Sequence, residues 1–394
     1  MHSTGHESNR QKRIPVKIAV NALSVQGGGG LTFLKNLLRH LLLIDKENEY
    51  LVLAVEAKIE ALGIHNSYPN LRTLIYPSRG WIARGMWEQI LLPWVMRRER
   101  VDILYAPGNQ GPVLFCCPFV VFIQNVDPLI REFKGYPLCF LLKREISRFL
   151  MRVSVRRARK VIAVSEYTRQ LIMRAFGYPQ EKIAVIGHGF PEEADAPFPE
   201  GTTVLQEVRP REPYFLAVST IKENKNYENL VQAFAAACAR LPESMNLLIA
   251  GEAEDQGCFS RVNKLVQENG LNSRVCFLGD VDVGTLRALY REAAALVFPS
   301  KRESFGLPPL EAMAYGIPLA ASRIEPIVEV CGDAACYFDP ENNQEMAEAM
   351  VEIVKNTELR KTLIERGLVQ AKLFSWEATA RRTLAIFHVA VSAV

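Results

Sequence analysis

Two glutamates frame the segment of this chain that most clearly predicts chemistry, Glu303-Ser-Phe-Gly-Leu-Pro-Pro-Leu-Glu311. The apolar run at 294–298 predicts a buried strand before it, and residues 310–315 predict a helix that a Gly-x-Pro sequence ends. Glu303 is therefore expected on a loop and Glu311 in the first turn of a helix. Open α/β sheets bind ligands at this place, outside the carboxyl ends of their strands. Backbone N–H groups at a helix start suit phosphate, and carboxylates accept hydrogen bonds from hydroxyl groups, so the segment suggests a nucleotide-sugar site.

The spacing of the two glutamates, the Phe-Gly-Leu-Pro interior and the continuation to Pro318 resemble the paired-glutamate signature of the retaining glycosyltransferases of family four. Members of that family have the GT-B fold. The resemblance implies that Glu303 contacts the donor sugar and that Glu311 contacts the ribose of the nucleotide. A surface loop with two solvated glutamates is the alternative. The resemblance also assigns four loop residues to donor binding, with the backbone N–H groups of 305–307 near the sugar and the phosphate: Ser304, Phe305, Gly306 and Leu307.

The segment 214–226 is similar to the phosphate-binding stretch of the same family. The similarity implies that Lys225 holds the diphosphate, because a cation there stabilises the negative charge that builds on the leaving nucleotide. Asn224 stands where the family normally has a basic residue, and Thr220 stands where some members have an arginine. Charge stabilisation is then expected to rest mainly on Lys225, with Lys222 as a second candidate, unless Lys225 is only a solvated loop lysine. Asn224, Thr220 and Gly251 complete the predicted donor-binding set.

The strand predicted at 119–123 shows the clearest departure from the family. Family members usually have His-Asp or His-Asn directly after this strand, whereas this chain has Gln124 and Asn125. A glutamine can hydrogen-bond a sugar hydroxyl but cannot act as a titrating base. Transfer with retention need not use such a base, because the leaving phosphate can take the acceptor proton and catalysis then rests on positioning and electrostatics. Gln124 is thus expected to be a catalytic residue together with Glu303 and Lys225. Asn125 and Asp127 are predicted to face the acceptor or the diphosphate, although Asp before Pro is also a common turn.

A run of glycines at 27–30 joins the first predicted strand to the first predicted helix. Glycines let a backbone approach a ligand closely, with N–H groups directed at it. The spacing is neither that of a dinucleotide fingerprint nor that of a P-loop. By itself the run is as consistent with a flexible turn, but the family has a glycine loop at this position. The resemblance thus implies that Gly28, Gly29 and Gly30 lie near the diphosphate and the acceptor.

Alternating strand and helix patterns run along both halves of the chain and predict mostly parallel sheets covered on both faces. The fold class is thus expected to be α/β, with two doubly wound, Rossmann-like domains that face a cleft, as in GT-B proteins. A Pro-rich, acidic break at 191–201 separates the halves. The expected organisation is a disordered tail at 1–14, an acceptor domain at 15–205, a nucleotide-sugar domain at 206–374 and a helix at 375–394 that crosses back to the first domain.

The bulk composition is that of an ordinary globular enzyme. The 394 residues are 49% hydrophobic and 23% charged, with a net charge of +4, which gives no reason to expect nucleic acid as a partner. No apolar run is long enough for a membrane span, and residues 1–14 lack the apolar core of a signal peptide, so a cytoplasmic protein is expected. No metal and no cofactor are expected, since no His, Cys or acidic cluster has ligand spacing.

The span 131–160 holds ten Lys or Arg against two Glu and also has an apolar stripe. A basic amphipathic helix suits an anionic membrane surface, so peripheral contact with the inner face of a membrane is one expectation. A helix with one face in the core and a solvated basic face is the alternative.

The predicted function is therefore hexosyl transfer with retention from a nucleotide sugar to an oligosaccharide, with a lipid-linked acceptor expected, in surface-polysaccharide biosynthesis. The Phe-Gly-Leu-Pro-Pro-Leu-Glu form resembles bacterial polysaccharide mannosyltransferases, which favours GDP-mannose as the donor and leaves a UDP-hexose as the alternative. Two other classes stay open. One is a nucleotide-sugar epimerase of the same fold, and the other is a catalytically silent relative that binds a nucleotide sugar or a partner.

Overall fold

The computed structural model describes residues 15–25, 28–64, 68–76, 80–114, 117–130, 138–190 and 213–392. Contacts within the chain divide it into two compact units. The first unit comprises residues 1–122, 145–161 and 383–394, and the second comprises 123–144 and 162–382. The last residues of the chain, 383–394, thus group with the first unit.

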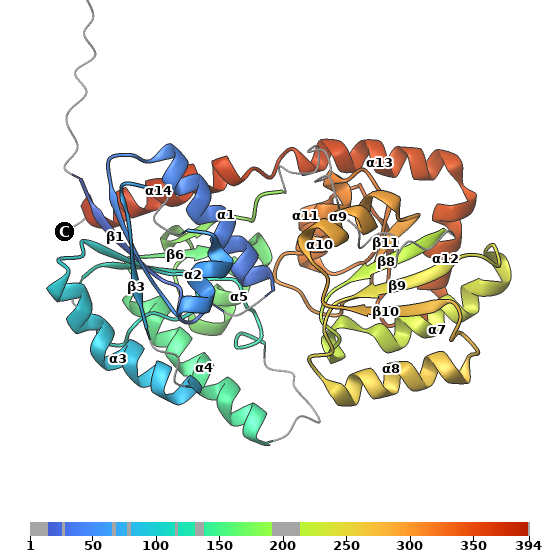
Figure 1. Ribbon diagram of the computed structural model, residues 1–394, viewed down its shortest axis with the longest axis horizontal. Helices are drawn as coiled ribbons and strands as arrows, with labels where there is room; N and C mark the ends of the chain where they lie inside the picture. Colours follow the sequence, from blue (N-terminus) through green and yellow to red (C-terminus); the bar gives the residue numbers. More distant parts are fainter. Residues whose placement is uncertain are drawn as a thin grey trace, which may run out of the picture. The chain divides into compact units, whose positions relative to one another are not determined.

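A seven-stranded sheet holds the strands of the N-terminal half (Figure 1). Its order is β3-β2-β1-β4-β5-β6-β7, and the paired strands β1 to β5 run parallel. The strands are β1 Lys17–Asn21, β2 Glu49–Ala54, β3 Leu71–Ile75, β4 Ile103–Ala106, β5 Phe119–Ile123, β6 Lys160–Ala163 and β7 Ile183–Val185. The helices between them are α1 Gly29–Ile44, α2 Glu56–Leu62, α3 Gly80–Arg98, α4 Leu138–Arg157 and α5 Glu166–Phe176. Strands β4 and β5 are buried along their whole length, as their continuous apolar sequences predict for a covered parallel sheet.

A six-stranded parallel sheet holds the strands of the C-terminal half, in the order β10-β9-β8-β11-β12-β13. The strands are β8 Tyr214–Val218, β9 Asn246–Ala250, β10 Val275–Gly279, β11 Ala295–Phe298, β12 Leu319–Ser322 and β13 Cys336–Phe338. The helices are α7 Tyr227–Ala237, α8 Gln256–Glu268, α9 Val283–Glu292, α10 Leu307–Ala314, α11 Glu325–Cys331, α12 Asn343–Lys355, α13 Thr357–Ala371 and α14 Trp376–Ser392. One core cluster of this half joins strand residues such as Phe215 and Leu247 to helix residues such as Phe234 and Met350.

The predicted α/β class with two doubly wound, Rossmann-like sheets is confirmed. The strands predicted at 119–123 and 294–298 lie within one residue of their observed bounds, and Ser165 caps α5 by accepting a hydrogen bond from the Thr168 N–H. Strand β13 and helices α11 to α13 were not predicted as separate elements. Two of these helices do have local start signals, since the side chains of Asn342 and Asn356 cap α12 and α13.

Candidate functional site

The topology of the second sheet identifies where a ligand should bind. Strand β8 lies at the centre, with β9 and β10 on one side and β11, β12 and β13 on the other. The chain thus leaves β8 and β11 in opposite directions, which is the switch point at which open α/β sheets bind ligands. The loops that follow β8 and β11 are residues 219–226 and 299–306, and these contain the two segments that the sequence singled out.

Three hydrogen bonds tie these two loops together. The Lys301 N–H donates to the Asn224 carbonyl at 2.9 Å, and the Asn224 side-chain amide donates to the Arg302 carbonyl at 3.2 Å. The Asn226 side-chain amide donates to the carbonyls of Pro299 at 3.0 Å and Pro340 at 2.7 Å. Asn226 has a φ of 64°, in the left-handed region that Asn tolerates better than most residues. Asn224 therefore joins the loops rather than supplying the positive charge that the family usually has at its position.

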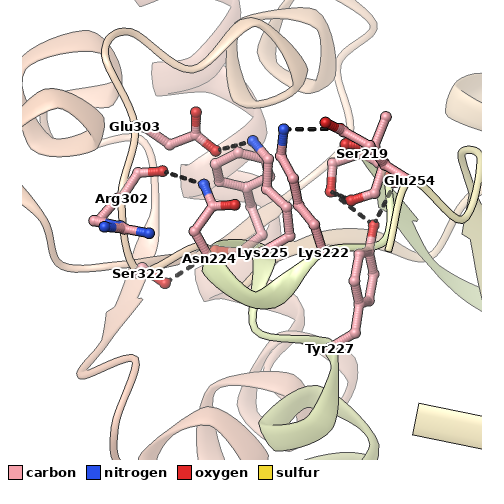
Figure 2. A network of polar contacts seen from close by, with 11 residues as sticks. Ser219, Lys222, Asn224, Lys225, Tyr227, Glu254, Arg302, Glu303 and Ser322 are labelled. Atoms are coloured by element: carbon pink, nitrogen blue, oxygen red, sulfur yellow. Dashed lines mark hydrogen bonds and ion pairs between the residues drawn. The ribbon is translucent and has the colours of Figure 1, made fainter. Parts of the chain in front are cut away.

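Lys225 and Glu303 meet at the centre of this arrangement (Figure 2). The Lys225 Nζ lies 2.6 Å from the Glu303 Oε1, and the two side chains are only 15% and 13% exposed. The Lys225 ammonium also lies 6.0 Å from the centre of the Phe298 ring. The structure thus brings together the residue predicted to bind diphosphate and the residue predicted to bind sugar. Partial exclusion of water strengthens the interaction of either group with a charged or polar ligand.

Lys222, the second candidate cation, has its own partner. Its Nζ donates to the Glu254 Oε2 at 2.9 Å, and Figure 2 shows this pair beside Lys225 and Glu303. Burial raises the pKa of the Glu254 carboxyl, but hydrogen bonds from Lys222 and Thr220 and the charge of Lys225 together hold it below its usual value. Glu254 was not predicted, although its place one turn after β9 puts it at the same sheet edge. It offsets the charge of Lys222 and holds Thr220, just as Glu303 offsets the charge of Lys225.

Gly251 follows β9 and touches the loop after β8. Its φ is +146°, and a Cβ placed there would lie 2.0 Å from the Ser219 carbonyl oxygen. The Ser219 carbonyl also accepts a hydrogen bond from the Tyr227 hydroxyl at 3.0 Å, which fixes the first residue of the loop. Gly251, predicted as a donor-binding residue, is thus required where two backbones approach closely.

The loop from Glu303 leads into α10 at Gly306, which has a φ of 111°. A Cβ at Gly306 would lie 2.6 Å from the Ile327 Cδ1, so the tight entry to the helix requires glycine. Helix α10 begins at Leu307, earlier than the predicted start at residue 310. Pro308 and Pro309 occupy its first turn, as proline's fixed φ favours, and they supply no N–H group. Backbone donors at this helix start must therefore come from residues 305–307.

Glu311 lies one turn into α10, so its predicted position in the first turn was wrong. Its Oε2 accepts a hydrogen bond from the Tyr290 hydroxyl at 2.8 Å. Tyr290 is buried in α9 and stacks on Tyr315, with ring centres 5.2 Å apart. Burial raises the pKa of the Glu311 carboxyl, and the Tyr290 hydrogen bond lowers it in part. Tyr290 is a site residue that the sequence did not indicate, because residues 290 and 311 meet only through the packing of α9 against α10.

Ser304 and Phe305 contact residues from the N-terminal half that belong to the same compact unit. The Ser304 carbonyl accepts a hydrogen bond from the Ser165 hydroxyl at 2.7 Å. The Phe305 ring lies edge-on to the His188 ring at 4.8 Å, and both side chains are buried. Burial lowers the pKa of His188 to about 3. His188 thus stays neutral at physiological pH and is a packing residue. The Ser304 carbonyl and the Phe305 ring anchor the loop.

Gln124, Asn125 and Asp127 lie directly after β5. The Asn125 Oδ1 accepts a hydrogen bond from the Asp127 N–H at 2.9 Å, which forms a local turn. The Asp127 carbonyl accepts a hydrogen bond from the buried Arg144 of α4 at 3.3 Å. The turn is thus anchored at the carboxyl end of its strand, and the role of these three residues toward the acceptor stays a prediction.

The glycine run enters α1 in the first unit. Gly28 has a φ of 67° and precedes the helix, Gly29 and Gly30 begin it, and Gly27 lies outside the described residues. Lys58 of α2 fixes the segment before the run, since its Nζ donates to the carbonyls of Leu23 at 2.7 Å and Ala22 at 3.2 Å, and also to Val25. The first-unit sheet has its own switch point between β1 and β4, and this segment leaves β1 there. The predicted ligand contacts of Gly28, Gly29 and Gly30 remain predictions.

No group of three or more His, Cys, Asp or Glu side chains that could hold a metal ion occurs within the part of the chain that the structure describes. Within the same residues, no helix is long and apolar enough to cross a membrane.

Comparison with known proteins agrees with the geometry. The family described as "Glycosyl transferases group 1" matches residues 206–369, and "Glycosyltransferase Family 4" matches residues 27–194. The O-antigen chain mannosyltransferase RfbU of Salmonella typhimurium is 31% identical over 266 residues, which span 67% of this chain and 69% of that protein. The O-antigen chain mannosyltransferase B of Escherichia coli is 30% identical over 231 residues, which span 58% of this chain and 60% of that protein.

Solved structures share the fold at low identity. Alr3699/HepE of Anabaena, solved in complex with UDP-glucose, matches with a TM-score of 0.75 and 18% identity over 95% of this chain and 99% of that chain. The two matched family regions correspond to the two halves of the chain that hold the two parallel sheets. The match to RfbU covers more than two thirds of that relative. The chain therefore belongs to glycosyltransferase family 4, the glycosyl transferases of group 1, and is a glycosyltransferase with the GT-B fold.

Proposed function

We propose that this glycosyltransferase transfers mannose from GDP-mannose, with retention, to a growing lipid-linked oligosaccharide in the biosynthesis of a surface polysaccharide. The observation that carries the site is the pairing of Lys225 with Glu303 at 2.6 Å, at the switch point of the second sheet. Support for mannose comes from two O-antigen chain mannosyltransferases that are 30% and 31% identical to this chain over the matched residues.

In this proposal Lys225 binds the diphosphate of the donor and stabilises the charge that builds on it as the sugar leaves. Glu303 accepts hydrogen bonds from hydroxyl groups of the transferred sugar, and Glu311 accepts one from the ribose. The backbone N–H groups of 305–307 add donors near the phosphate, where the helix start also favours negative charge. The leaving phosphate takes the proton of the acceptor hydroxyl, so Gln124 only positions the acceptor and no side chain has to act as a base.

No metal or cofactor is part of the proposed reaction, because Lys225 and the start of α10 supply the positive potential that the diphosphate needs. The proposal includes peripheral contact with an anionic membrane through the span 131–160, of which residues 131–137 lie outside the described part of the chain. A UDP-hexose is the alternative donor, and the match to a protein solved with UDP-glucose keeps it in the test.

The test is turnover of GDP-mannose and of a panel of UDP-sugars by the wild type and by Glu303→Ala, followed as donor hydrolysis and as transfer to oligosaccharide acceptors. Lys301→Met is the control, since Lys301 is two residues away and forms a longer and more exposed ion pair, with Glu341 at 2.9 Å. We expect one donor to be turned over by the wild type and the control but not by Glu303→Ala.

Turnover of a UDP-hexose alone would replace the proposed donor, and the anomeric configuration of the product, read by NMR, tests retention. Release of a free epimer without transfer would mean an epimerase. Binding of a donor without turnover on any acceptor would mean a catalytically silent relative.

A further inference from the structure

Exposed apolar side chains gather on two helices of the N-terminal half. More than half of the large hydrophobic residues that are exposed in the described chain lie on α3, on α4 or in the loop between β4 and β5. Six of them define what we call the apolar face: Met86, Ile90, Trp94, Leu114, Ile146 and Phe149. Trp94 is 58% exposed, and Leu114 and Phe149 are each 64% exposed. Large exposed apolar side chains that gather on neighbouring elements of a globular protein mark a candidate interaction site.

The six residues share one side of the sheet. Helix α3 connects β3 to β4 and helix α4 connects β5 to β6, so both crossovers run in the same direction along the sheet order. Because such crossovers are right-handed, the two helices cover the same face (Figure 1). The loop before Leu114 joins them directly, since the Val113 N–H donates to Gln89 of α3 at 2.6 Å and the Val113 carbonyl accepts from Arg157 of α4.

The spacing along each helix aligns the apolar residues with basic ones. On α3 the exposed residues Met86, Ile90 and Trp94 recur every four positions, and Arg97 follows on the same stripe. The Arg98 guanidinium lies 5.5 Å from the centre of the Trp94 ring.

Helix α4 repeats this arrangement. Ile146 and Phe149 extend a stripe that begins at Leu142, and the exposed Arg152 and Arg156 continue it. Against these arginines, α4 exposes one acidic side chain, Glu145. Both stripes thus pass from apolar to basic in the same chain direction. This composition suits contact with a partner surface in which hydrocarbon lies below a layer of negative charge.

We propose that the apolar face docks this protein onto the surface of an anionic lipid bilayer. Met86, Ile90, Trp94, Ile146 and Phe149 would enter the boundary between headgroups and acyl chains, while the arginines contact lipid phosphates. Neither helix is long and apolar enough to span a membrane, so both lie on the surface. The inference deepens the proposed function, because it brings the enzyme to a lipid-linked acceptor, but it holds for any transferred sugar.

The experiment is sedimentation of the full chain with phosphatidylcholine vesicles, with and without phosphatidylglycerol, at low and high salt. Two double variants test the face: Trp94→Ser with Phe149→Ser removes apolar contacts, and Arg97→Glu with Arg156→Glu reverses charge. The matched control is Val369→Ser with Leu373→Ser, since these residues are 68% and 72% exposed but lie at the C-terminal end of α13 and just beyond it. Circular dichroism confirms that each variant is folded.

We expect the wild type and the control to bind anionic vesicles, more weakly at high salt. Loss of the two apolar side chains should lower the partition coefficient for the vesicles at least about tenfold. In the charge variant, each of the two arginine reversals should contribute a further lowering of about fivefold or more. Donor hydrolysis without lipid should be unchanged in all variants, which separates this proposal from the catalytic one.

The proposal fails if the wild type does not prefer anionic vesicles, or if the control loses binding as much as the face variants do. It also fails if sedimentation without lipid shows dimers that the Trp94→Ser, Phe149→Ser variant abolishes, because a second copy of the chain would then be the occupant.

Discussion

Replacement of Lys225 by methionine tests the central assignment, because methionine keeps much of the length and removes the charge. The Lys225 ammonium and the Glu303 carboxylate are 2.6 Å apart and their side chains are 15% and 13% exposed. Loss of one preorganised charge at a developing anion typically lowers kcat about 10²–10³-fold, which corresponds to about 3–4 kcal/mol. We therefore expect Lys225→Met to lower kcat by about this factor with the donor that the wild type uses.

The same substitution should also destabilise the fold, so a loss of activity could also arise from a loss of stability. Exposed ion pairs contribute about 0–1 kcal/mol, while breaking a fully buried pair costs about 3–5 kcal/mol. A pair with about one seventh of its surface exposed lies between these cases, so we expect a loss of about 1–3 kcal/mol in the free energy of unfolding. The loss arises because Glu303 keeps its charge without a partner.

A double variant separates the two effects. Glu303→Gln in the Lys225→Met background removes the unpaired charge and should restore part of the stability. It should not restore kcat, because neither the cation nor the carboxylate is then available to the donor. The measurements are steady-state kinetics and urea unfolding of the wild type, both single variants and the double variant, with Lys301→Met as the control. Unchanged kcat in Lys225→Met, or recovery of kcat together with stability in the double variant, would reduce the pair to a structural salt bridge and refute the reasoning.

Three further predictions concern Tyr290, Glu311 and Gly251. Tyr290→Phe removes the hydrogen bond that lowers the pKa of Glu311. The donor KM should rise as pH falls through that pKa, so in the variant this rise should begin at a higher pH than in the wild type; an unshifted KM–pH profile would exclude Tyr290 as a positioning residue. Because the folded state holds this proton more tightly than the unfolded state, the contribution of Glu311 to stability should fall as pH rises from the unfolded pKa to the folded one, as urea unfolding at several pH values can check. Gly251→Ala would place a Cβ 2.0 Å from the Ser219 carbonyl oxygen at a φ of +146°, so a loss of at least about 2 kcal/mol in stability is expected, and an unaltered midpoint of thermal unfolding would contradict the close approach.

The proposed mechanism depends on how firmly the donor-binding loops are held. The donor half is built from loops that follow adjacent strands of one sheet and are tied by hydrogen bonds through Asn224 and Asn226. Such ties hold Lys225 and Glu303 in place before a donor binds, which is the condition under which electrostatic stabilisation is effective. Both lysines of the loop after β8 are paired with a glutamate, Lys222 with Glu254 and Lys225 with Glu303, and the Lys225 pair is the less exposed of the two.

The sequence by itself determined the fold class, most of the strands and the two donor segments. Parallel strands covered on both faces have continuous apolar sequences, and Gly306 and Pro308 mark the entry to α10 by backbone preferences that depend on neighbouring residues alone. Glu303 could be placed on a loop from the strand and helix predicted around it, whereas Lys225 was placed by the similarity of 214–226 to the family's phosphate-binding stretch.

Only the tertiary structure decided which side chains meet. Tyr290 reaches Glu311, and Glu254 reaches Lys222, across sequence separations of 21 and 32 residues, and no local pattern encodes these contacts. The start of α10 also differed, because the strained entry at Gly306 lets two prolines begin the helix and moves Glu311 into its second turn. The apolar face likewise required the structure: hydrophobic spacing predicts an amphipathic helix, but whether that stripe faces the core or solvent is set by the packing of the helix on its sheet.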